Sequence, residues 1–63
     1  MNKTKKFPKA INEEHYTFLF DSEHLSRASA HIRFRELLRD TLPDDSKYRI
    51  LKLDDYRYGL YIF

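Results

Sequence analysis

Polar and apolar residues alternate over two short stretches of the chain, and a third short stretch carries no charge; together these patterns predict three β-strands. The first stretch, HYTFLF over residues 15–20, has aromatic residues at every second position, and a strand turns successive side chains to opposite faces. The stretch YRILKLDD over residues 48–55 follows the same period of two, and the uncharged stretch YGLYIF over residues 58–63 is the third predicted strand. We therefore expect one strand before residue 21 and two strands after residue 47.

Apolar residues three or four positions apart predict one α-helix between the first two strands. Residues that cluster at about 100° per residue form its core face: Ala30, Phe34, Leu37, Leu38 and Thr41. Asp21 is the predicted N-cap, since Phe20 and Leu25 have the spacing of a hydrophobic staple around it. Pro43 disfavours helical geometry at Leu42, so we expect the helix to end near Thr41.

The order of these elements, β-α-β-β, predicts a small α+β domain. The strand over residues 58–63 carries no charge, whereas the strand over residues 48–55 carries Arg49 and Lys52, and charged residues commonly protect an exposed sheet edge. We therefore place the third strand between the first and the second, in the order 1-3-2, with all neighbours antiparallel and the helix on one face. Residues 11–63 form this single domain, and residues 1–10 form a basic, largely disordered tail.

One helix covers only one face of such a sheet, so the other face needs an explanation. The helix can pack on Phe18, Phe20, Leu60 and Ile62 or on the alternative strand faces. The residues left over are too apolar for an idle solvent face; they include some combination of Thr17, Leu19, Tyr48, Ile50, Lys52, Tyr61 and Phe63. The N-terminal segment covers this face, or another protein or a second copy does, or its aromatic rings stack on unpaired bases.

The back of the helix carries a second apolar feature. Ile32 lies nearly opposite the core face, with Arg35 and Arg39 beside it. Two interpretations stay open at this point. Ile32 is a single exposed apolar residue of the common kind, or it is the centre of a protein-contact patch with arginines around it.

The charge of the chain is unevenly distributed. The formal net charge is +2, but residues 1–10 hold four lysines and no acidic residue; subtracting their +4 from +2 leaves the remaining residues at −2. The positive excess is therefore in the tail. This distribution weakens the case for a folded domain that attracts nucleic acid through its overall charge.

The sequence offers little for catalysis or metal binding. There is no cysteine, and the single glycine excludes phosphate-cradling loops. His24 and His31 are seven residues apart, about 10 Å along a helix, which is too far for one zinc ion. We predict no enzyme activity, no catalytic residue, no metal and no cofactor. No stretch resembles a signal peptide or a membrane span, so we expect a cytoplasmic protein that does not engage membranes.

The combined sequence evidence favours a small non-enzymatic module that acts by protein–protein contact, as an inhibitor or regulator of a larger protein. In size and style it is of the kind that mobile elements encode to block host proteins, which is an analogy only. The predicted partner-binding residues are Ile32, Arg35, Arg39, Tyr61 and Phe63. Homodimerisation through the uncovered sheet face is compatible with this function.

The alternative function is nucleic-acid binding, which we rank below protein contact because the domain is acidic. It would use the lysine-rich tail together with the basic flank of the helix. The residues predicted for it are Lys3, Lys5, Lys6, Lys9, Arg27, Arg35 and Arg39.

Overall fold

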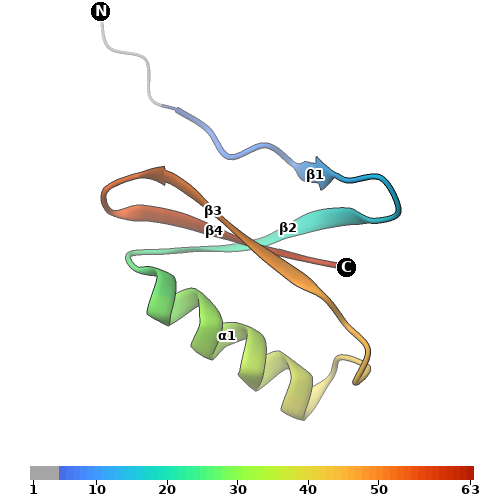
Figure 1. Ribbon diagram of the computed structural model, residues 1–63. Helices are drawn as coiled ribbons and strands as arrows, with labels where there is room; N and C mark the ends of the chain where they lie inside the picture. Colours follow the sequence, from blue (N-terminus) through green and yellow to red (C-terminus); the bar gives the residue numbers. More distant parts are fainter. Residues whose placement is uncertain (1–4) are drawn as a thin grey trace, which may run out of the picture.

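The computed structural model shows one helix packed on one face of a curled antiparallel sheet (Figure 1). It describes residues 5–63. The elements are β1 (Ala10–Asn12), β2 (Thr17–His24), α1 (Arg27–Asp40), β3 (Tyr48–Asp54) and β4 (Arg57–Ile62). The strands lie in the order β1-β2-β4-β3. Within the described residues, no helix has the length and apolar character needed to cross a bilayer.

This architecture confirms the predicted α+β class and the relative order of the three predicted strands. The sheet has one more strand than predicted, because β1 pairs with the outer side of β2, where Ile11 faces Phe18 across the ladder. A strand of three residues is too short to produce a detectable alternation. β1 begins at Ala10, the last residue of the predicted tail.

The predicted start of the helix is wrong. β2 continues through Asp21 to His24, and the N-cap is Ser26, whose hydroxyl accepts a hydrogen bond from the Ser29 amide at 3.1 Å. A bulge between Phe20 and Ser22 lets the strand continue past Asp21 while still pairing with β4. The staple is absent, since Leu25 is 78% exposed. The predicted end is confirmed, because Thr41 is the C-cap.

The core lies between α1 and the sheet face that α1 covers. Ala30 and Phe34 of α1 are buried against Leu60 of β4, and the Phe34 ring stacks on Tyr48 of β3 with centroids 4.1 Å apart. Further apolar residues pack around this centre: Leu38, Leu42, Tyr48, Ile50 and Ile62. Because an exposed helix of this size is not stable alone, this packing is what keeps α1 helical.

The other side of the sheet faces away from α1 and is covered by the N-terminal segment (Figure 1). We call this side the open face, because no helix packs on it. The Phe7 ring stacks on Phe20 of β2 with centroids 5.3 Å apart. The Tyr61 hydroxyl donates to the Pro8 carbonyl at 2.7 Å. Of the three explanations for the uncovered apolar face, the structure shows the first: the chain's own N-terminal segment folds back over it. Of the predicted tail, residues 5–10 lie against the sheet, and residues 1–4 lie outside the described residues.

Phe7 reaches the sheet because β4 carries the only glycine of the chain at the crossing point. A methyl group built on Gly59 would lie 2.8 Å from two atoms of the Phe7 ring. Real side chains do not approach so closely, so any larger residue here would push the ring away. Gly59 therefore provides the space that lets the N-terminal segment lie flat on the sheet.

Candidate functional site

A groove runs between helix α1 and strand β3, and two of the predicted partner-binding residues line it. The α1 groove has a volume of about 410 Å³, and its lining residues are Ala28, His31, Ile32, Arg35 and Tyr48. Ile32 is 59% exposed. The structure therefore brings Ile32 and Arg35 together in one concave surface.

The β3 side of the α1 groove is held in place by the core. The Tyr48 hydroxyl and His31 Nδ1 share a hydrogen bond of 2.8 Å, and the two rings meet edge to face with centroids 5.4 Å apart. Tyr48 also stacks on the buried Phe34. This wall of the groove is thus preorganised, and preorganised surfaces lose less conformational entropy when a partner binds.

Arg39, the third predicted residue on α1, lies outside the α1 groove. Its guanidinium hydrogen-bonds the neighbouring Asp40 carboxylate, with Nε 3.0 Å from Oδ1, and this bond raises the pKa of Arg39. Arg27 is also turned elsewhere, with its guanidinium 5.5 Å above the centre of the Tyr58 ring. Arg35 is therefore the helix arginine that the α1 groove includes.

Tyr61 and Phe63, the other two predicted partner-binding residues, lie on the open face. Tyr61 is completely buried, and burial raises the pKa of its hydroxyl. Phe63 is 53% exposed and packs edge to face on Tyr16, with centroids 4.8 Å apart. The structure does not bring these two residues together with Ile32 and Arg35, because the sheet separates them.

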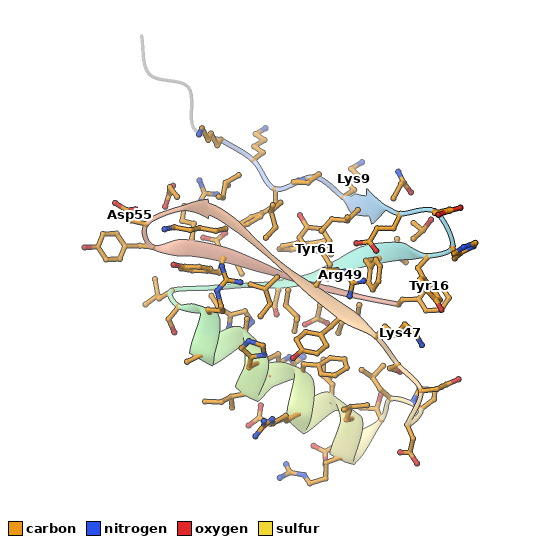
Figure 2. The ribbon with its side chains drawn as sticks, in the orientation of Figure 1. Lys9, Tyr16, Lys47, Arg49, Asp55 and Tyr61 are labelled. Carbon is orange, nitrogen blue, oxygen red and sulfur yellow. The ribbon has the colours of Figure 1, made fainter. Side chains whose placement is uncertain are left out.

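The open face carries a layer of cations over aromatic rings, which the sequence did not reveal (Figure 2). The cationic groups of Arg49 and Lys47 lie 4.6 and 5.2 Å from the centres of the Phe18 and Tyr16 rings. Such contacts stabilise by about 0.5–2 kcal/mol each. The signal in the sequence was the spacing of Lys47 and Arg49, two positions apart; of these two residues, we interpreted only Arg49, together with Lys52, and only as edge protection.

Carboxylates neutralise Arg49 and a second arginine of the open face, Arg57. Arg49 forms a two-bond pair with Glu13, at 2.8 and 3.0 Å. Arg57 pairs with Glu23 at 3.2 Å and lies 5.3 Å from the centre of the Phe7 ring. Their charges are therefore largely satisfied within the molecule.

The residues predicted for nucleic-acid binding are divided between two sides of the molecule. Lys6 and Lys9 line a shallow depression of about 510 Å³ on the open face, next to Phe20 and Arg57. The helix residues Arg27, Arg35 and Arg39 lie on the other side of the sheet. The Lys5 carbonyl accepts a hydrogen bond from Arg57 at 2.8 Å. Lys3 lies outside the described residues.

The histidines have partners within the fold. His24 bonds the hydroxyls of Ser22 at 2.7 Å and Ser29 at 2.9 Å, linking β2 to α1, and His31 bonds Tyr48. Among residues 5–63 no three His, Cys, Asp or Glu side chains gather closely enough to hold a metal ion.

No family model, no curated protein and no solved structure matches this chain.

Proposed function

We propose that this chain is a small non-enzymatic binding module that acts by contact with another protein, as an inhibitor or a regulator. The observation that supports the proposal is the α1 groove, where the exposed Ile32 and Arg35 border a wall fixed by the Tyr48–His31 pair. An apolar centre with an arginine at its side is typical of protein-contact surfaces. A cytoplasmic location remains a prediction from the sequence.

The test is to place a charge in the groove and measure capture of the partner. An Ile32→Asp variant should lose capture of proteins from an extract of the source cells by about tenfold or more, since it buries a carboxylate against an apolar partner. Its fold should survive, because Ile32 is exposed and surface substitutions change stability little. Circular dichroism checks the fold, and quantitative mass spectrometry measures the captured protein.

The matched control is Leu25→Asp. Leu25 is even more exposed than Ile32, at 78%, and it does not line the α1 groove. This variant should capture the same proteins as the unmodified chain. Equal capture by both variants would contradict the assignment of the groove, and unfolding of Ile32→Asp would show that Ile32 has a structural role.

Nucleic-acid binding is the second candidate, and one observation favours it. The depression on the open face combines the basic groups of Lys6 and Lys9 with the partly exposed ring of Phe20, and base-stacking sites combine aromatic rings with cations in this way. Nuclease treatment of the same extract separates the two candidates. Capture that disappears with nuclease, and that falls steeply with salt, would favour this candidate.

A further inference from the structure

The outer edge of β3 has no partner strand among the described residues, because β3 ends the sheet. It is seven residues long, whereas β1, which ends the sheet on the other side, has only three. Proteins usually shorten or cover their sheet edges, since an open edge is a template for pairing with another chain. β3 is neither short nor covered, and its protection is the charge of Arg49 and Lys52, which disfavours an arbitrary strand but admits a strand with matching charges. This edge is therefore a candidate binding surface.

The hydrogen-bond pattern shows which backbone groups this edge presents. The amides and carbonyls of Lys47 and Phe63 bond each other reciprocally, at 3.3 and 2.9 Å. Hydrogen-bonded and non-hydrogen-bonded pairs alternate along an antiparallel ladder. From the register of β3 against β4, the backbone groups of Tyr48, Ile50 and Lys52 point outward from the sheet. The Tyr48 carbonyl accepts a hydrogen bond from the Arg49 guanidinium at 2.8 Å, whereas the groups of Ile50 and Lys52 can bond one further strand.

We propose that the occupant of this edge is a second copy of the same chain, with its β3 antiparallel to the first across a two-fold axis at Leu51. Around this axis Ile50 of each copy pairs with Lys52 of the other, and both residues have outward-pointing backbone groups. Leu51 faces its own counterpart. Ile50, Leu51 and Leu53 are only partly buried in the single chain, so pairing removes more apolar surface from water.

The charges along β3 favour a copy of itself as the partner. Lys47 lies just before the start of β3, and Asp54 and Asp55 lie at its other end. Antiparallel pairing on Leu51 brings Lys47 of each copy next to Asp55 of the other, at the two ends of the paired strands. Opposite charges across a ladder stabilise a strand pair.

The neighbouring symmetric registers are less favourable. An axis at Arg49 or at Lys52 pairs that residue with itself, and like charges directly opposite are destabilising. An axis at Ile50 places Arg49 opposite Leu51 and Lys47 opposite Leu53, so it brings no basic residue opposite an acidic one. Leu51 is therefore the axis that the sequence supports.

The dimer goes beyond the function proposed above and does not depend on it. A two-fold axis perpendicular to the sheet keeps both α1 helices on the same face, and the α1 groove of each copy lies on the side of the helix next to β3. The two grooves therefore flank the axis, and the dimer presents two contact surfaces to one partner. Two linked contacts bind more tightly than one.

Light scattering of the full chain is the first test. We expect a mass of about 15 kDa, twice the 7.7 kDa of one chain, that falls toward the single-chain value on dilution. The second test is disulfide capture, which is clean because the chain has no cysteine of its own. Across the axis the two Leu51 Cα atoms are about 4.5 Å apart, as in other non-hydrogen-bonded pairs, and this distance suits a disulfide.

The matched control for Leu51→Cys is Leu53→Cys. Both leucines lie in β3 and are partly buried, but the two Leu53 residues are displaced by about 13 Å along the strand, too far for a disulfide. Under mild oxidation we expect the Leu51→Cys variant to form a covalent dimer at least about tenfold faster. Circular dichroism of both variants checks that they fold alike.

Two results would overturn the dimer. One is a single-chain mass at every concentration, and the other is equal cross-linking of the two variants. Neither result bears on the proposed function. That function is tested by the capture experiment with Ile32→Asp and Leu25→Asp. A dimeric Ile32→Asp protein that captures no partner would support both proposals.

Discussion

At the scale of single residues, Gly59 decides how the N-terminal segment lies on the sheet. From the sequence alone, the presence of a single glycine only excluded phosphate-binding loops. Its contact with Phe7 joins residues that are far apart in the sequence, and local periodicity cannot detect such a contact. The same reason explains why the Tyr61–Pro8 hydrogen bond was unexpected.

A Gly59→Ala substitution should displace Phe7. The added methyl group would lie 2.8 Å from the Phe7 ring, so the ring must leave its stacked position on Phe20. We expect a loss of about 1–2 kcal/mol in the free energy of unfolding, the range of one aromatic pair together with part of a cation–π contact. Urea denaturation measures the loss, and trypsin should cut faster at Lys6 and Lys9.

The control is the same substitution in a Phe7→Ala background. Without the Phe7 ring, most of the steric clash at residue 59 disappears. The remaining close contact is with Tyr61, whose Cε1 would lie 3.0 Å from the new methyl group. Gly59→Ala should then cost less than half as much. An equal cost in both backgrounds would mean that the sheet itself, rather than Phe7, requires the glycine.

At the scale of elements, periodicity predicted the type of every long element and was wrong where one element passes into the next. Alternation identified β3, and the uncharged stretch identified β4, within one residue of their observed starts. The helix start was misplaced because Asp21 has the chemistry of an N-cap, and a β-bulge is not visible in the pattern. Ser26 has the same capping chemistry and is the residue that the fold uses.

Ser26→Ala and Asp21→Ala test this correction. Loss of the Ser26 hydroxyl leaves the Ser29 amide without its bond and should lower the free energy of unfolding by about 1 kcal/mol. Asp21 forms an exposed ion pair with Arg33 at 3.5 Å, and such pairs contribute little.

Salt distinguishes the two effects. In urea denaturation at high salt, the Asp21→Ala effect should disappear, because salt screens exposed ion pairs. The Ser26→Ala effect should persist, because the cap is a hydrogen bond. If Asp21→Ala lowered the free energy of unfolding more than Ser26→Ala does at high salt, Asp21 rather than Ser26 would be the N-cap.

At the scale of the whole molecule, the sequence predicted the layers but not the two-sided core. One face of the sheet packs on α1, and the other packs on the chain's own N-terminal segment (Figure 1). The apolar excess of the strands correctly indicated that both faces were covered. The sequence did not show what covers the second face. The predicted partner-binding residues on the open face therefore included Tyr61, which the N-terminal segment buries.

Removing residues 1–8 should destabilise the domain far more than a loss of tail charge would. The truncation exposes Phe20 and Tyr61, and it removes the Phe7 ring and the hydrogen bonds that the Lys5 and Pro8 carbonyls accept. Burial of one Phe side chain contributes about 1.5–3 kcal/mol, and each bond contributes about 0.5–1.5 kcal/mol. The expected loss of about 3–5 kcal/mol is comparable with the whole stability of a domain of this size.

The measurement is urea denaturation followed by circular dichroism, with a dye that binds exposed apolar surface as a second signal. A Lys6→Gln/Lys9→Gln double variant is the control, since it removes the charge and keeps the contacts of Phe7 and Pro8. It should unfold at nearly the same urea concentration as the full chain. If the truncated chain kept its stability and bound no dye, the N-terminal segment would be an accessory of the sheet, and the open face would again be available to a partner.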